Sequence, residues 1–145
     1  MAYATLTDLL QVEPTIQEYG VLDWDTELSR SETEINRVLR VRWYQSYQKQ
    51  HPSTINVDMD VDLLDPTQFT QATVYHALAY HISPKLTQHS GGEPDKFQMM
   101  MQYYQGRFEH EMDLILREGV RYDLDEDSTF ERTETGRVNT LRLVR

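Results

Sequence analysis

The sequence predicts a mainly α protein: a small helical bundle with three long helices, one extended excursion and an extended C-terminal tail. Apolar residues recur every three or four positions over three long stretches, which is the spacing that keeps one face of an α-helix apolar. Prolines and the Gly91-Gly92 pair fall between these stretches or at their ends, so they separate the helices. A chain of 145 residues is long enough to fold as one domain without disulfides.

The first part of the chain predicts two short helices and one long helix. The short helices are expected at Thr5–Val12 and Pro14–Tyr19, where proline suits the first turn. The capping-box pattern that begins at Ser31 predicts the start of the first long helix. That helix is expected to reach about Lys49 and to end before Pro52, because the residue before a proline disfavours the helical conformation.

An extended excursion is expected at Ile55–Leu63, because its residues alternate between apolar and acidic types, which is the period of an extended chain with one wet face. The apolar side is predicted to hold Val57, Met59, Val61 and Leu63. The wet side is predicted to hold Asp58, Asp60 and Asp62.

The second long helix is expected to begin at Asp65-Pro66, where a capping aspartate precedes a proline in the first turn, and to end near Pro84. Apolar residues surround it almost completely, so it is predicted to be the most buried element. After a turn at Ser90–Pro94, the third long helix is predicted over Asp95–Gly119, with glycine as its C-cap. Its apolar face is expected to pack against the second helix and contains Phe97, Met101, Tyr104, Phe108, Met112 and Ile115.

Composition limits the possible partners. The formal net charge of -10 repels phosphate, which disfavours tight DNA or RNA binding over the outer surface. The absence of cysteine excludes disulfides, Cys-ligated zinc and thiol catalysis. Neither a signal peptide nor a membrane-spanning segment is expected, because no apolar run is long enough.

After Gly119 the composition changes, and we divide the chain into a helical bundle domain (1–122) and an acidic loop with a C-terminal docking tail (123–145). The loop places acids at positions one, three, five and twelve of a calcium-loop pattern, which would supply oxygen ligands on one turn. The sixth position is Ser128 rather than the usual glycine, so a solvated acidic loop or an acidic docking surface is the competing interpretation. The possible calcium ligands are Asp123, Asp125, Asp127, Thr129 and Glu134.

The histidines are not expected to form a metal site. His76 and His81 are five residues apart on one predicted α-helix, so they should face different directions. His110 lies between two glutamates, and consecutive side chains spread around a helix. No nucleophile motif, glycine-rich phosphate loop or zinc-protease motif occurs, so we predict no catalytic residues and no enzyme activity.

The last residues of the chain combine β-prone apolar side chains with arginine. Such an end can add a strand to a partner's sheet or bind in a groove. A frayed terminus, or a strand paired with Ile55–Leu63, explains the pattern equally well. The residues predicted to dock are Val138, Leu141, Arg142, Leu143, Val144 and Arg145.

Several stretches together resemble the head–tail connector (adaptor) proteins of tailed bacteriophages. They are Met1–Leu10, the Glu34-Ile35-x-x-x-Leu39-x-x-x-Trp43-Tyr44 helix, the Phe69–Leu86 helix with Tyr80 and Pro84, and the Tyr122–Asp127 loop followed by Arg142-Leu143-Val144-Arg145. The resemblance covers most of the chain. This sequence departs from the family at Ser128, where glycine is frequent, and over Val57–Asp62, which has no aligned counterpart.

The resemblance implies a virion protein of the neck, made in the host cytoplasm and not associated with a membrane. It implies a dodecameric homo-oligomeric ring beneath the portal protein, with one end of the chain reaching into the portal. The lower rim would receive another neck or tail-completion protein, and DNA would pass through the channel without specific binding. Asp58, Asp60 and Asp62 are candidates for the channel lining, because acidic groups offer DNA no counterion release.

Overall fold

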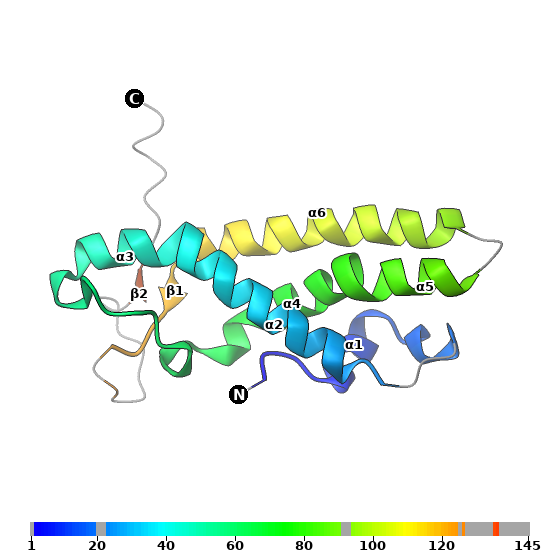
Figure 1. Ribbon diagram of the computed structural model, residues 1–145, viewed down its shortest axis with the longest axis horizontal. Helices are drawn as coiled ribbons and strands as arrows, with labels where there is room; N and C mark the ends of the chain where they lie inside the picture. Colours follow the sequence, from blue (N-terminus) through cyan, green and yellow to red (C-terminus); the bar gives the residue numbers. More distant parts are fainter. Residues whose placement is uncertain (1, 20–22, 91–93, 125, 127–134, 137–145) are drawn as a thin grey trace, which may run out of the picture.

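A computed structural model describes residues 2–19, 23–90, 94–124, 126 and 135–136. Three long helical rods lie along the molecule, and the predicted mainly helical bundle is confirmed (Figure 1). Two of the rods contain a π-helical segment, which the apolar spacing of the sequence did not predict. The first rod is α2 (Asp25–Leu39), the Arg40–Tyr44 π segment and α3 (Gln45–Gln50); the second is α4 (Thr70–Ala77), the Leu78–Ile82 π segment and α5 (Ser83–Ser90); the third is α6 (Pro94–Glu118).

Shorter elements complete the described fold. The short helix α1 (Leu6–Val12) and a 3-10 turn at Ile16–Tyr19 match the two predicted N-terminal helices to within two residues. Further 3-10 turns occupy Pro52–Thr54, Val61–Leu63 and Pro66–Phe69. The strands β1 (Val120–Arg121) and β2 (Thr135–Gly136) pair antiparallel, with Val120 opposite Gly136.

The predicted start of the first long helix was wrong by six residues. α2 begins at Asp25, where the side chain of Asp23 accepts a hydrogen bond from the Asp25 N–H at 3.0 Å. This acid satisfies one of the free N–H groups of the first turn. Ser31, the predicted cap, is instead fully buried in the middle of the helix.

The second rod runs past the expected end at Pro84 and reaches Ser90. A proline inside an α-helix presses on the carbonyl four residues earlier and cannot donate to it. Here the π segment ends at Ile82, two residues before the proline, and the Ser83 N–H donates five residues back, to the Leu78 carbonyl. The wider turn changes the position of Pro84 relative to the carbonyls of the preceding turn, and the helix continues through the proline.

The Ile55–Leu63 excursion is only partly extended. It begins with a turn in which Asn56 has a positive φ of 69° and ends in the Val61–Leu63 3-10 turn. The prediction that the apolar side of the excursion is buried is confirmed in part, because Met59 is buried whereas Val57 is 54% exposed. Asp58, Asp60 and Asp62 are exposed, as the alternation predicted.

The third helix follows the prediction closely. α6 begins one residue before Asp95 and ends at Glu118, and Gly119 adopts the predicted left-handed C-cap with φ 107°. Five of the six predicted face residues are buried, and Met101 is partly exposed. This face packs against α4, the Leu78–Ile82 π segment and α5, and Figure 1 shows α5 and α6 side by side and antiparallel.

Two hydrophobic clusters fill the bundle. One is rich in aromatic side chains and lies under the Arg40–Tyr44 π segment; its largest members are Trp43, Tyr44, Tyr47, Phe69 and Tyr122. The other is mostly aliphatic and lies under α1 and the Leu78–Ile82 π segment; it includes Leu9, Ile16, Leu28, Val74, Leu78 and Ile82. The second rod contributes to both clusters and is the most buried element, as predicted. Among the described residues, no helix is both long enough and apolar enough to cross a membrane.

Candidate functional site

Hydrogen bonds to side chains of the body hold the middle of the acidic excursion in place. The hydroxyl of Tyr44 donates to the Val57 carbonyl at 2.8 Å, and the side-chain amide of Gln48 donates to the same carbonyl at 3.2 Å. The Asp60 N–H donates to the hydroxyl of Tyr122 at 3.0 Å. These bonds fix the backbone of the excursion, while its three aspartates remain in solvent.

Tyr122 connects the excursion to the aromatic cluster. Its ring packs on Trp43, with ring centroids 5.5 Å apart in an edge-to-face arrangement. Burial raises the pKa of Tyr122 to about 12, so the hydroxyl stays neutral and serves as a hydrogen-bond partner. The backbone of Leu64 also bridges to Tyr122, and the excursion therefore has a defined position at one end of the bundle.

The predicted calcium loop lies mostly outside the described residues. Asp125, Asp127, Thr129 and Glu134 are not described, and the remaining candidate, Asp123, is nearly buried. Its N–H donates to the carbonyl of Leu63 at 2.9 Å. The predicted docking tail, which holds Val138, Leu141, Arg142, Leu143, Val144 and Arg145, also lies outside the described residues, so both remain predictions.

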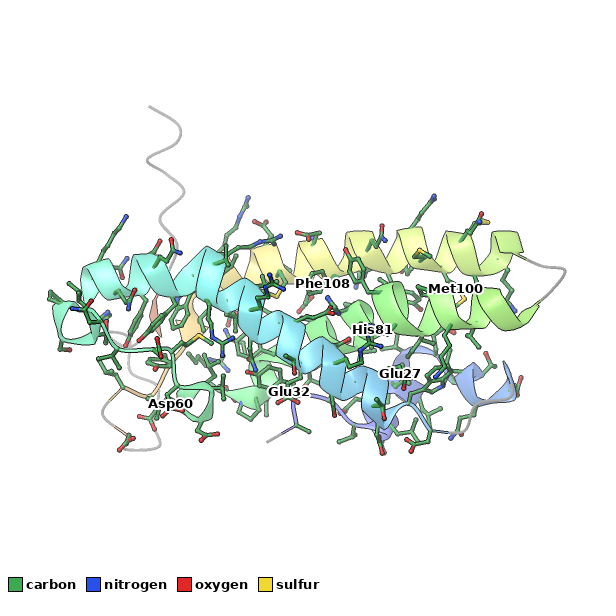
Figure 2. All side chains as sticks on the ribbon, viewed as in Figure 1. Glu27, Glu32, Asp60, His81, Met100 and Phe108 are labelled. Atoms are coloured by element: carbon green, nitrogen blue, oxygen red, sulfur yellow. The ribbon has the colours of Figure 1, made fainter. Side chains whose placement is uncertain are left out.

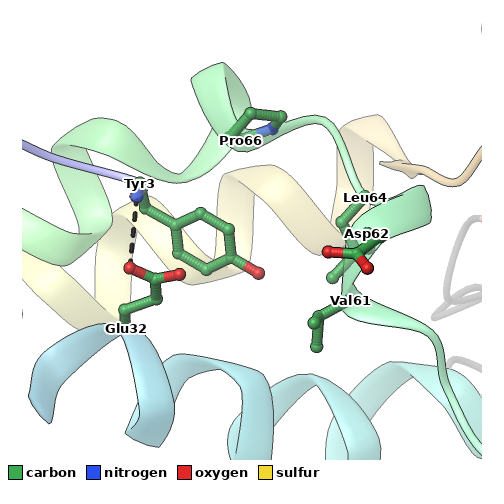
Figure 3. A pocket seen from close by; sticks show the side chains of 6 residues that line it. All are labelled: Tyr3, Glu32, Val61, Asp62, Leu64 and Pro66. Atoms are coloured by element: carbon green, nitrogen blue, oxygen red, sulfur yellow. Dashed lines mark hydrogen bonds between the residues drawn. The ribbon is translucent and has the colours of Figure 1, made fainter. Parts of the chain in front are cut away.

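A small cavity opens beside the excursion (Figure 3). Its volume is about 30 Å³, which is enough for a water molecule or two and too small for a substrate. Glu32 lies on one wall and accepts a hydrogen bond from the Tyr3 N–H at 3.4 Å. The cavity is lined by Tyr3, Glu32, Val61, Asp62, Leu64 and Pro66.

A cluster of two histidines and one glutamate lies between α2 and the second rod. His76 Nε2 is 2.9 Å from Glu34 Oε2, and His81 Nε2 is 3.4 Å from the same oxygen. Both imidazole side chains are almost fully buried, whereas the carboxylate side chain is 45% exposed. Figure 2 shows His81 near the middle of the bundle, far from Asp60.

The expectation that His76 and His81 face different directions was wrong. The Leu78–Ile82 π segment begins two residues after His76 and includes His81. Hydrogen bonds in a π-helix join residues five apart, so such residues lie above one another as residues four apart do in an α-helix. The two ring centroids are 5.6 Å apart as a result. The signal available in the sequence was the proline shortly after His81, which favours a local departure from α-helical spacing.

The ring of His76 is held on both sides. Its Nδ1 lies 3.0 Å from the hydroxyl of Ser31 in the buried interior. The ring of Phe108, from α6, meets it edge to face with centroids 4.8 Å apart, and the ring of Tyr80 lies 4.6 Å away. A buried helix-to-helix contact therefore fixes the orientation of the imidazole.

Burial sets the protonation of both rings. It lowers the pKa of His76 to about 4, against the opposing effect of the nearby Glu34 carboxylate. Burial also lowers the pKa of His81, with Glu34 again acting in the opposite direction and Arg30 adding to the decrease. Both imidazoles are therefore neutral near pH 7, the form in which a ring nitrogen can offer a lone pair.

The chain matches no protein-family model, no curated protein and no solved structure.

Two chemical roles are open to the Glu34, His76 and His81 cluster. In the first role, the Nε2–H of His76 donates to the Glu34 carboxylate at 2.9 Å and joins α2 to the second rod, while His81 Nε2 lies near the same oxygen at 3.4 Å without a hydrogen bond. In the second role, the Nε2 lone pairs and the carboxylate oxygen bind a metal ion. Their ligand atoms lie within 4.8 Å of one another, and among the described residues this is the one group of histidines and acids with such spacing.

Proposed function

We propose that this protein is a structural, non-enzymatic subunit of the neck of a tailed bacteriophage. It forms a homo-oligomeric ring adaptor, of dodecameric size by resemblance, between the portal and the next neck or tail-completion protein. Two lines of support meet here. One is the resemblance carried by the sequence motifs, and the other is the group of large exposed apolar side chains on the outer side of α6.

The observation that carries the proposal is the outward face of α6. Met99, Tyr103 and Leu114 are 70%, 60% and 44% exposed. Met99 and Tyr103 lie one turn apart on the side away from the buried stripe, and Leu114 lies three turns further along the helix. Single exposed apolar residues are ordinary, but several large ones on the outer side of one helix are typical of a surface that a partner covers. An added Cβ at Gly106, on the same face, would meet nothing within 4 Å, so a neighbouring helix can approach closely there.

The excursion supplies the second feature that the proposal uses. Asp58, Asp60 and Asp62 are exposed on a loop whose backbone is fixed by Tyr44 and Tyr122. Carboxylates at a channel wall repel phosphate and release no counterions to DNA, so DNA slides past them without being held. We assign these three residues to the channel lining.

Electron microscopy of the protein mixed with the portal complex of the same virus tests the proposal. The expected result is a ring of this protein on one end of the portal. Tyr103→Asp should abolish ring formation, because it places a charge in an apolar contact. Gln98→Asp, at another exposed α6 position beside the buried Phe97, is the matched control and should leave the ring intact. Bare portals with folded wild-type protein would refute the function.

Truncation tests the docking tail separately. Removal of residues 138–145 should leave the circular dichroism spectrum of the bundle unchanged and abolish binding to the portal. Undiminished portal binding by the truncated chain would refute the assignment of the tail while leaving the ring proposal intact.

Calcium titration separates this function from the alternative, a calcium-regulated binding module that uses the Asp123–Glu134 loop. The adaptor proposal predicts no calcium binding heat in calorimetry. A saturable heat that Asp125→Ala removes would favour the alternative function.

A further inference from the structure

We propose that Glu34, His76 and His81 form a binding site for a divalent transition-metal ion, with zinc the best match to the ligand set. The site would join α2 to the second rod inside each subunit. It does not depend on the proposed neck function, because all three ligands come from one chain.

The distances suit a metal centre. In a tetrahedral zinc site with metal–nitrogen bonds of about 2.0–2.1 Å, neighbouring ligand atoms are about 3.3 Å apart. The two Nε2 atoms lie 2.9 and 3.4 Å from Glu34 Oε2, and all three ligand atoms lie within 4.8 Å of one another. The Glu34 side chain is 45% exposed, so it can move as the ion enters, and the three ligand atoms would adjust toward the separation of about 3.3 Å that a tetrahedral ion imposes.

The ligand types point to the same class of ion. Imidazole nitrogen suits zinc, copper, nickel and iron, whereas calcium and magnesium prefer six or more oxygens. Two histidines and one carboxylate leave at least one coordination position for water, as in zinc sites that have three protein ligands. Because the Glu34 side chain is 45% exposed, solvent reaches the cluster from its side and provides an entry path for the ion.

Ser31 gives His76 the support that metal-bound histidines usually have. A metal on Nε2 requires the proton to sit on Nδ1, and the partner of Nδ1 holds that tautomer in place. The Ser31 hydroxyl lies 3.0 Å from Nδ1 and can accept that proton's hydrogen bond. Because a hydroxyl can also donate, Ser31 fits the metal-free tautomer equally well, and it is therefore a positioning residue in both states.

The cluster is built by the π segment. The Ser83 N–H donates to Leu78, five residues back, and this wider turn brings His81 to the side of the rod that carries His76. π-helical turns are rare and occur frequently at functional sites. The position of this π turn beside a pair of candidate metal ligands agrees with that tendency.

Isothermal titration calorimetry with zinc chloride tests the site, on full-length protein without an affinity tag and after dialysis against a chelator. The expected result is one zinc ion per chain and a rise in thermal stability on zinc addition, because the ion binds the folded state. Cobalt chloride should give visible d–d absorption of a low-coordinate ion, which reports directly on the ligand geometry.

Two pairs of matched variants assign the ligands. Glu34→Gln keeps a hydrogen-bonding side chain next to both imidazoles but is a poor ligand, so the fold survives and zinc affinity should fall by at least about 100-fold. His81→Gln should lower the zinc affinity by a similar factor. Their controls are Glu111→Gln and His110→Gln on α6, which should bind zinc like the wild type.

Ser31→Ala tests the positioning role and should weaken zinc binding by about 10- to 100-fold, with the cobalt spectrum retained at saturation. The absence of zinc binding by the folded wild-type protein would overturn the proposal and leave the cluster as a hydrogen-bond contact. Unchanged affinity in both Glu34→Gln and His81→Gln would also overturn it.

Discussion

The two π segments occupy similar places in adjacent rods and have different surroundings. The Arg40–Tyr44 π segment places Trp43 and Tyr44 in the aromatic cluster. The Leu78–Ile82 π segment brings His81 to His76 and to the carboxylate of Glu34. The same backbone departure thus supports packing in one rod and gathers polar atoms in the other.

The difference teaches that a π turn has no chemistry of its own. It changes which residues lie above one another, and the side chains at those positions decide the result. Around Trp43 those side chains are aromatic rings, whose contribution to the free energy of unfolding does not depend on pH. Around His76 the side chains are imidazoles and a carboxylate, which titrate, so the stability of that region should depend on pH and on metal ions.

Trp43→Ala gives the largest expected effect. The indole is fully buried, and its ring centroid lies 4.8 Å from that of Tyr47 and 5.5 Å from that of Tyr122. Truncation leaves a large cavity and should lower the free energy of unfolding by about 3–5 kcal/mol, measured by urea denaturation followed by circular dichroism. The loss should be the same at pH 5 and pH 8; a strongly pH-dependent loss would contradict the comparison.

The pH dependence of stability is the next largest effect, measured on metal-free protein with a chelator present. Because burial lowers the pKa of His76 from 6.5 to about 4, the unfolded state binds more protons than the folded state between these values. The histidine therefore costs no stability above pH 6.5, and stability falls as the pH drops from 6.5 to 4, by at most about 3 kcal/mol. Glu34 and Glu109 oppose the shift, and His81 adds to it.

His76→Gln should remove part of this pH dependence, because glutamine does not titrate. Unfolding midpoints in urea between pH 4 and pH 8 provide the measurement. His110→Gln, at an exposed α6 position, should keep the wild-type slope. An equal slope in His76→Gln and the wild type would show that the buried imidazole does not carry the effect.

Tyr122→Phe removes the hydroxyl that joins the excursion to the aromatic cluster and keeps the ring. The Asp60 N–H loses its acceptor at 3.0 Å, so stability should fall by about 1 kcal/mol. Limited proteolysis should cut faster within 55–63 than in the wild type, while cleavage elsewhere stays unchanged. Tyr75→Phe is the control, because the Tyr75 hydroxyl accepts a hydrogen bond from the exposed Arg107 on α6 and does not contact the excursion in the part of the chain that the structure describes.

Much of the fold could be predicted from the sequence because it depends on local patterns. The apolar spacing and the glycine cap located α6 to within one residue at either end. The start of α2 was missed because Ser31 has the residue type of a cap but is buried against His76, and burial depends on the tertiary fold. The helix after Pro84 could not be predicted, because a proline interrupts a helix that keeps α-helical spacing before it.

Less of the candidate sites could be predicted. Exposure of Asp58, Asp60 and Asp62 followed from the alternation, whereas their attachment through Tyr122 depends on a contact across 62 residues. The spacing of His76 and His81, five positions apart, argued against a histidine cluster. That conclusion holds for an α-helix and fails at a π turn, for which the proline after His81 is the local signal.

The ion pair between the Arg40–Tyr44 π segment and α6 should have the smallest effect. Arg42 contacts both carboxylate oxygens of Glu109, at 3.0 and 3.4 Å, but both side chains are roughly half exposed. Water and salt screen such a pair, so Glu109→Gln should change the free energy of unfolding by about 0.5 kcal/mol or less. A double-mutant cycle with Arg42→Gln isolates the coupling energy. A coupling energy above about 2 kcal/mol would mean that an exposed ion pair also stabilises the Arg40–Tyr44 π segment. The two π segments would then differ in the exposure of their charged groups, and the difference between aromatic and titrating side chains would not be enough to explain the comparison.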